Sequence, residues 1–179
     1  MQFRQVFPII LGLLYCIPVS CTPLGQTIES RQLLPAGLVN LNFTHIAGHL
    51  TPLTLVTNTA NVDFDVAPII PNLSLLVAIS ITSVTLSAGI SGTEYLAFTH
   101  DFDTPLSVPL TGSVNSGTIN DASLTQGALP TVFNAFPAQS LDILGASVSM
   151  EVTIITPPFT APLLLPLTQS NVATTWSLF

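Results

Sequence analysis

Apolar and polar residues alternate along most of the stretch from Val77 to Phe102. Apolar side chains occupy the odd positions from Val77 to Ile81 and the even positions from Val84 to Ile90. A period of two is that of a β-strand with one buried face. Because the apolar positions change parity once, we predict one extra residue, a β-bulge, at Thr82-Ser83, which keeps both sets facing the interior.

A turn at Gly89, Ser91 and Gly92 is expected to end this strand and to begin a second one, which extends to Phe102. The two strands form the predicted centre of the fold. The inner face of the second strand is expected to consist of Leu96, Phe98, His100 and Phe102, and its outer face of Tyr95, Ala97, Thr99, Asp101 and Asp103.

The other apolar runs are short and are separated by Pro, Gly, Asn and Ser. In the first run, Leu38 to Ile46, we expect His45 on the inner face and Asn42 on the outer face. Turn signals about every ten residues predict an all-β fold of about eight to ten short strands, an antiparallel β-sandwich of the immunoglobulin or fibronectin type III kind. The remaining predicted strands are Pro52 to Thr57, Asn61 to Ala67, Ser113 to Ile119, Ala122 to Thr125, Leu141 to Leu144, Ser147 to Ile154 and Asn171 to Phe179. Pro105 to Leu110 is expected to be an edge strand or an extended connector, and Leu129 to Ser140 has no clear period.

The amino-terminal segment has the features of a secretory signal peptide. Arg4 lies in a short polar start, an apolar run extends from Val6 to Ile17, and cleavage is expected after Cys21, with lipoprotein-type cleavage before Cys21 as the alternative. Both cysteines would leave with the signal, so we expect neither thiol chemistry nor a disulfide in the secreted protein. The predicted organisation is a signal peptide over residues 1–21, a linker or short pro-segment over 22–35 and one β domain over 36–179.

The chain has only two basic residues, Arg4 and Arg31, so it contains no Lys or Arg from Gln32 onward. Eight of its nine acidic residues follow that point, which gives this part a formal charge of −8. Nucleic acids and anionic membranes are bound by clustered cations, so both classes of partner are excluded. The low charged fraction, 6%, and the 48% of apolar residues are typical of a β protein whose polar face consists of Ser, Thr and Asn.

Two resemblances follow from longer stretches of the sequence. The run Ile81 to Gly89, the segment Pro105 to Pro109 and the ending Leu167 to Thr175 resemble small secreted proteins of fungi that have no assigned activity. The order of a long strand, a Gly turn, a second strand and a Pro-bounded edge is similar to the late-embryogenesis-abundant type 2 (LEA-2-like) β-sandwich. Both resemblances imply a β-sandwich, and neither supplies catalytic residues.

The densest group of reactive side chains is His100-Asp101-Phe102-Asp103. Asp101 and Asp103 share one strand face and could bind Ca²⁺ or serve as the carboxylate pair of a glycosidase. The other interpretation is a solvated strand end. Asp63-Phe64-Asp65 repeats the pattern, and a cation site is expected only if the two pairs meet across a sheet edge. Without that meeting we predict no metal, no cofactor and no catalytic residue, and two N-glycosylation sites at Asn42 and Asn72.

These observations favour a secreted, extracellular, non-catalytic structural or interaction module at the cell surface or wall. A cell-wall polysaccharide, an apolar ligand and a second copy of the chain are the candidate partners, and no transmembrane segment is expected once the signal has been removed. Binding of a lipid between the sheets is the first alternative, because the apolar fraction is high. A glycosidase that uses Asp101 or Asp103 is the second, and a Ser-His-Asp group cannot be recognised from spacing alone.

Overall fold

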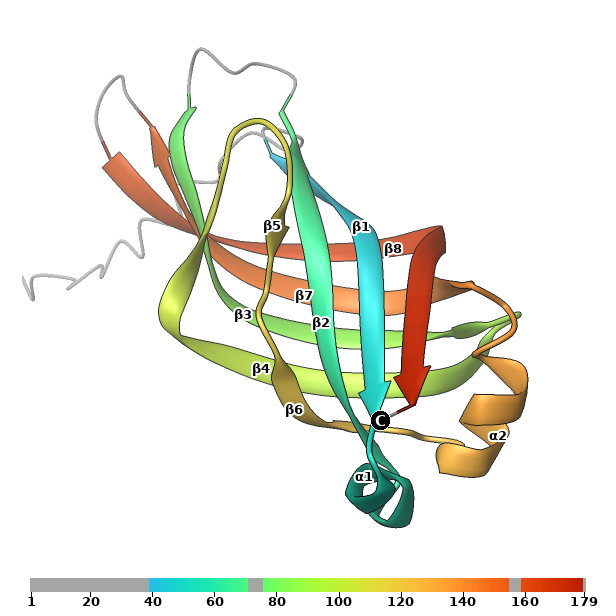
Figure 1. Ribbon diagram of the computed structural model, residues 1–179. Coiled ribbons are helices and arrows are strands. Elements are labelled where there is room, and N and C mark those ends of the chain that lie inside the picture. The colour runs from blue at the N-terminus through green and yellow to red at the C-terminus, as the bar shows by residue number, and fades with distance from the viewer. Residues whose placement is uncertain (1–38, 71–75, 155–158, 179) are drawn as a thin grey trace, which may run out of the picture. The chain divides into compact units, whose positions relative to one another are not determined.

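Eight β-strands and two short helices make up the part of the chain that the structure, a computed structural model, describes, namely residues 39–70, 76–154 and 159–178 (Figure 1). The predicted signal peptide, the predicted linker and the sequon at Asn72 lie outside these residues. The strands are β1 (Asn40–Leu50), β2 (Thr59–Ile69), β3 (Leu76–Ile90), β4 (Thr93–Val108), β5 (Val114–Asn115), β6 (Ile119–Ser123), β7 (Ser140–Ile154) and β8 (Phe159–Leu178), and the helices are α1 (Pro52–Thr57) and α2 (Ala128–Asn134).

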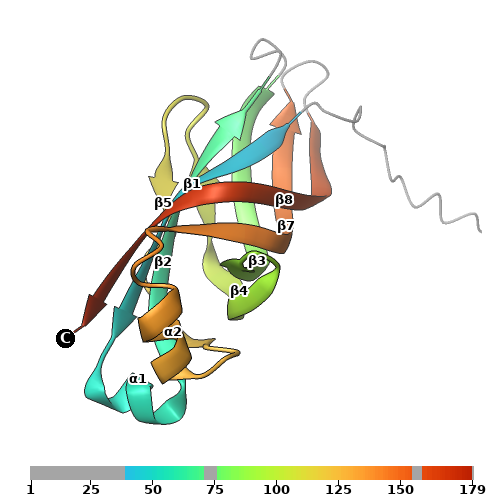
Figure 2. The same cartoon turned by 90° about the vertical axis from the view of Figure 1, so that its right-hand side faces the viewer.

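Seven of the strands close into a barrel in the order β1-β8-β7-β3-β4-β6-β2, because β1 also pairs with β2. Among the strands of the described residues, only the β1–β8 pairing is parallel, and β5 adds a short antiparallel pairing to β2. The predicted all-β fold is confirmed. The pairing differs from the two separate sheets of the predicted sandwich, since β8, at 20 residues, pairs first with β7 and then, from Ala173, with β1 (Figure 2). That change of partner closes the sheet into a barrel, because the same strands are also joined through β4 and β6.

The predicted central hairpin is present as β3 and β4, joined at Ser91 and Gly92. The register shifts between Ile81 and Ser83 in the pairings of β3 with both neighbours, so the bulge inferred from the change of parity is confirmed. The apolar side chains on both sides of the bulge are therefore buried together. They are Ile79, Ile81, Val84, Leu86 and Ala88.

The segment Pro52–Thr57 is a helix, so the prediction of a strand there is wrong. Thr51 is the N-cap: its side chain accepts a hydrogen bond from the Thr54 N–H at 3.2 Å, and the Thr54 hydroxyl accepts one from the Thr51 N–H at 2.8 Å. Pro52 suits the first helical turn, where no backbone donor is needed. These local bonds outweigh the weak two-residue alternation of the apolar side chains. The unassigned stretch after Gly127 likewise contains a helix, α2.

The expected orientation of His45 is also wrong. A register shift in β1 between Phe43 and His45 reverses the alternation, so that Ile46 is buried and His45 lies on the outer face. Asn42, on the other side of the shift, is on the outer face as predicted and is half-buried.

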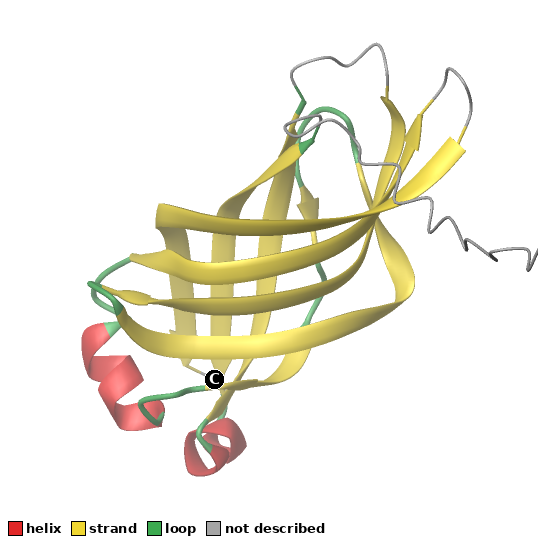
Figure 3. Ribbon diagram, turned by 180° about the vertical axis from the view of Figure 1, so that it is seen from behind, coloured by secondary structure: helices red, strands yellow, loops and turns green. Residues whose placement is uncertain are grey.

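The barrel interior is filled by large apolar side chains, and α1 and α2 lie together at one end of it (Figure 3). Phe64 is central to the packing: its ring centroid lies 5.2 Å from that of Phe43 and 6.2 Å from that of Phe98. These contacts join β1, β2 and β4. The outer face of β1, β2 and the end of β8 carries the polar side chains described next.

Candidate functional site

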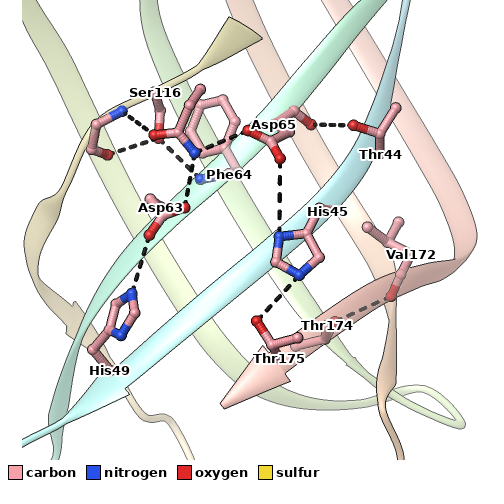
Figure 4. Close-up of polar contacts among 12 residues, drawn as sticks. Thr44, His45, His49, Asp63, Phe64, Asp65, Ser116, Val172, Thr174 and Thr175 are labelled. Carbon is pink, nitrogen blue, oxygen red and sulfur yellow. Dashed lines mark hydrogen bonds and ion pairs between the residues drawn. The ribbon is translucent and has the colours of Figure 1, made fainter. Parts of the chain in front are cut away.

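Two histidines of β1 lie beside two aspartates of β2 on the outer face of the barrel (Figure 4). His49 Nε2 is 3.1 Å from Asp63 Oδ2, within hydrogen-bonding distance, and His45 Nδ1 is 4.0 Å from Asp65 Oδ2. The alternation of strand residues places each pair on one face, and the antiparallel pairing brings the two strands together. Because the chain has no Lys or Arg from Gln32 onward, histidine is the side chain available there to pair with a carboxylate.

Asn115 in β5 joins the two aspartates. Its side-chain nitrogen donates to Asp63 Oδ1 and to Asp65 Oδ1, each at 2.9 Å, while its oxygen accepts from the Gly117 N–H at 2.8 Å. The next residue, Ser116, accepts from the Phe64 N–H at 3.0 Å and so fixes the same loop to β2. One neutral amide therefore holds two carboxylates that would otherwise repel each other.

Hydroxyl groups of β8 bond to the other nitrogen of each imidazole. Ser177 Oγ lies 2.8 Å from His49 Nδ1, and Thr175 Oγ1 lies 3.1 Å from His45 Nε2. The parallel pairing of β1 with β8 sets this register. Two chains of hydroxyl, imidazole and carboxylate therefore cross three strands side by side. We call the whole group the His-Asp surface; it consists of His45, His49, Asp63, Asp65, Asn115, Thr175 and Ser177.

A hollow of about 450 Å³ adjoins the His-Asp surface. Its wall combines hydrogen-bonding groups with two aromatic rings, those of Phe136 and Trp176, which stack with centroids 5.0 Å apart and an interplanar angle of 16°. We call it the Trp176 hollow; it is lined by His45, Phe136, Gln139, Ala173, Thr174, Thr175 and Trp176. His45 and Thr175 belong to both features, so the hollow and the polar surface form one continuous site.

Two residues of the hollow have energetically unfavourable features: the backbone conformation of Gln139 and the unpaired indole N–H of Trp176. Gln139 has a φ of 54°, in the left-handed region that favours glycine. The indole Nε1 of Trp176 is buried and has no hydrogen-bond partner among the described residues. An unpaired buried donor costs about 1–3 kcal/mol. Positive φ at a residue other than glycine also occurs outside the hollow, so among the described residues it is the unpaired indole donor that distinguishes this feature.

A second hollow, of about 480 Å³, lies over β3, β4 and β7. Small residues form it, among them Ser87, Ala97 and Gly145, and it contains neither an imidazole nor a carboxylate. Of its hydroxyl groups, that of Thr85 pairs with that of Thr99 at 3.1 Å, and that of Ser87 donates to the Glu94 carboxylate. This hollow therefore offers fewer groups to a polar ligand than the Trp176 hollow does.

The four aspartates named from the sequence fall into two places. Asp63 and Asp65 belong to the His-Asp surface, whereas Asp101 and Asp103 are exposed on the outer face of β4, where Asp101 pairs in register with Ser83. His100 is half-buried, and its ring meets that of Phe102 edge to face at 4.7 Å. In residues 39–70, 76–154 and 159–178, no group of three or more His, Cys, Asp or Glu side chains could hold a metal ion. None of the helices found there is long and apolar enough to cross a membrane.

Neither a scan against protein-family models nor a search of curated proteins finds a match for this chain. The interpretation of the site therefore rests on its own geometry.

Sequence reasoning missed the partners that complete the site. His49 and Ser177 are 128 residues apart, and His45 and Thr175 are 130 apart, so only the fold brings them together. Two local signals were present, the two-residue spacing of Asp63 and Asp65 and the four-residue spacing of the histidines. Both histidines follow the register shift in β1, so their four-residue spacing places them on one strand face.

Proposed function

We propose that the protein is a secreted, non-catalytic binding module whose ligand is a neutral polysaccharide held at the Trp176 hollow. One observation carries the proposal: the hollow joins aromatic side chains to a set of uncharged donors and acceptors. A sugar ring presents apolar C–H groups and several hydroxyls, which need both kinds of partner. Gln139, Thr175 and His45 supply the polar contacts, and Phe136 and Trp176 the apolar ones.

The charge of the protein supports an uncharged ligand. With no Lys or Arg from Gln32 onward and a formal charge of −8 there, anionic polymers are repelled. The amino-terminal apolar run and the sequon at Asn42 fit a protein that works outside the cell, where such polymers occur.

A hydrolase is the second candidate, because Ser177, His49 and Asp63 form a hydrogen-bonded chain. The geometry of this chain supports catalysis less well than the Trp176 hollow supports binding. The side chain of His49 is 46% exposed, and neither His49 nor Ser177 lines the Trp176 hollow. The parallel chain through Thr175 does reach the hollow, but its imidazole and carboxylate are 4.0 Å apart, longer than a hydrogen bond. Neither chain combines complete hydrogen bonding with a place for a substrate.

The two alternatives raised by the sequence have weaker support. A lipid inside the barrel would have to displace the packed rings of Phe43, Phe64 and Phe98. A glycosidase that uses Asp101 and Asp103 would work on an exposed strand face, and neither residue lines the two hollows described above. Native mass spectrometry for a bound lipid, and hydrolysis assays of Asp101→Asn and Asp103→Asn, test these two ideas.

Binding to insoluble cellulose, chitin and β-glucan tests the main proposal. The protein secreted from a eukaryotic host is mixed with each polymer, and the fraction left in solution is measured against polymer mass. Thr175→Val removes one hydroxyl of the hollow and should weaken binding roughly threefold to tenfold, the loss of one hydrogen bond. Thr99→Val, an exposed strand hydroxyl on β4, is the matched control and should bind as the parent does. Equal binding by both variants, or no binding to any neutral polymer, would reject the proposal.

A further inference from the structure

The end of the barrel that carries the two helices is apolar and exposed. The helices are held together there, because the Asn58 side chain at the end of α1 accepts a hydrogen bond from the Ala128 N–H at the start of α2 at 2.9 Å. Figures 2 and 3 show them side by side. Each helix therefore exposes one face to solvent at this end of the barrel.

Those outer faces carry large apolar side chains. Leu53 and Val56 are three residues apart on α1, and Leu129 and Phe133 are four apart on α2, so each pair shares one helical face. All four side chains are between 68% and 80% exposed. The opposite faces are buried against the barrel, through Thr54 on α1 and Ala128 and Thr131 on α2. We call the four exposed residues the helical patch.

The two chain segments that carry the helical patch contain no charged or histidine side chain. Residues 50–62, which include α1, and residues 122–141, which include α2, contain no Asp, Glu, Lys, Arg or His. The eight carboxylates that follow Gln32 lie elsewhere, in β2, β4, β6 and β7. The helices themselves therefore carry none of the protein's negative charge.

We propose that the helical patch docks on the surface of an uncharged lipid layer. A surface-bound apolar helix face buries itself at the boundary of headgroups and acyl chains, about 5–10 Å deep, and needs no cations when the lipid is zwitterionic. The two helical segments match such a surface, because neither carries a charged side chain that would have to be dehydrated on entry. The formal charge of −8 selects against anionic lipids.

A second copy of the chain fits the helical patch less well. A large apolar side chain exposes roughly 150–200 Å² in full, so the patch offers on the order of 500 Å². A stable interface buries about 800 Å² on each partner. A patch of this size suits entry into a lipid surface, where acyl chains adapt their shape to the side chains.

Flotation with lipid vesicles tests the proposal. The amino terminus of the secreted protein is first determined by mass spectrometry. The protein is then mixed with vesicles of phosphatidylcholine and, separately, with vesicles of phosphatidylcholine and phosphatidylglycerol. Leu53→Ser/Phe133→Ser removes one side chain from each helix. Leu164→Ser is the matched control, because Leu164 is 63% exposed on β8, on a strand away from the helices. Circular dichroism and thermal melting establish that all variants are folded.

The parent protein and Leu164→Ser are expected to float with phosphatidylcholine vesicles and to float less when phosphatidylglycerol is added. The double variant should lose at least about tenfold in partition coefficient, as expected for two large apolar side chains. Equal partitioning of the double variant and the parent would overturn the proposal, as would failure of the parent to bind phosphatidylcholine. A monomer–dimer equilibrium in sedimentation that the double variant abolishes, without any vesicle binding, would assign the patch to a second copy instead.

Discussion

Gly48 of β1 and Trp176 of β8 are paired in register and so close that a Cβ atom at Gly48 would overlap Cε3 and Cζ3 of the indole. Glycine at this position therefore lets the tryptophan reach its place beside Phe136. The side chain that defines the hollow depends on the absence of a side chain on the neighbouring strand.

Gly48→Ala is expected to displace Trp176 and to destabilise the protein by about 1–3 kcal/mol, the usual effect of overpacking. Urea unfolding measures the change. Gly145→Ala is the control, because a Cβ there meets nothing within 4 Å, and its effect should stay within about 0.5 kcal/mol. Equal stability of the two variants would show that the indole moves away freely.

Gln139→Gly separates the stability of the hollow from its binding function. Glycine adopts the φ of 54° found at Gln139 without steric penalty. We therefore expect a free energy of unfolding that is unchanged or up to about 1 kcal/mol higher. Polysaccharide binding should nevertheless fall, because one hydrogen-bonding side chain has been removed. A variant that is more stable and binds as tightly as the parent would remove Gln139 from the site.

Gln169→Ala tests whether the Gln169 side chain stabilises the contact between β8 and β1. The Gln169 side chain accepts from the Phe43 N–H at 2.9 Å and donates to the Phe43 carbonyl at 2.7 Å, so it binds β8 to β1 before the direct pairing of these strands begins at Ala173. Truncation leaves both backbone groups of Phe43 unpaired, and a loss of about 1–3 kcal/mol is expected. Hydrogen exchange of the Phe43 amide, measured by NMR, should be faster in the variant. Protection equal to that of the parent would contradict this role.

Thr54→Val tests the cap of α1, the helix found where a strand was predicted. The substitution keeps the shape of the side chain and removes the hydroxyl that accepts from the Thr51 N–H. We expect a loss of about 0.5–2 kcal/mol in thermal or urea unfolding, the range for helix caps. An unchanged midpoint would mean that packing alone holds α1.

The parts of the fold that could be predicted are those that depend on residues close together in the sequence. The bulge in β3 was visible because the apolar positions change parity within three residues, from Ile81 to Val84. The orientation of His45 was not, because the shift in β1 follows Phe43 near the end of the apolar alternation. The closure of the barrel depends on the change of partner within β8, which no local pattern records.

The candidate site shows the same division. Asp63 and Asp65 were recognisable as one strand face from their spacing alone. Their actual neighbours, His45, His49 and Asn115, come from β1 and β5, so the pairing of distant strands decides what the carboxylates contact. The position of Trp176 depends on the pairing of β8 with β1 at Gly48. Neither segment alone predicts the hollow beside it.

Fluorescence titration of Trp176 tests the central proposal most directly, because it is the only tryptophan in the chain and it lines the hollow. A soluble oligosaccharide of the polymer that binds best is added to the secreted protein, and the emission spectrum is followed. We predict a saturable change in intensity or wavelength, with a weaker apparent affinity for Thr175→Val than for Thr99→Val. A spectrum that stays constant while the same oligosaccharide competes with the polymer for the protein would place the binding site elsewhere and contradict the account.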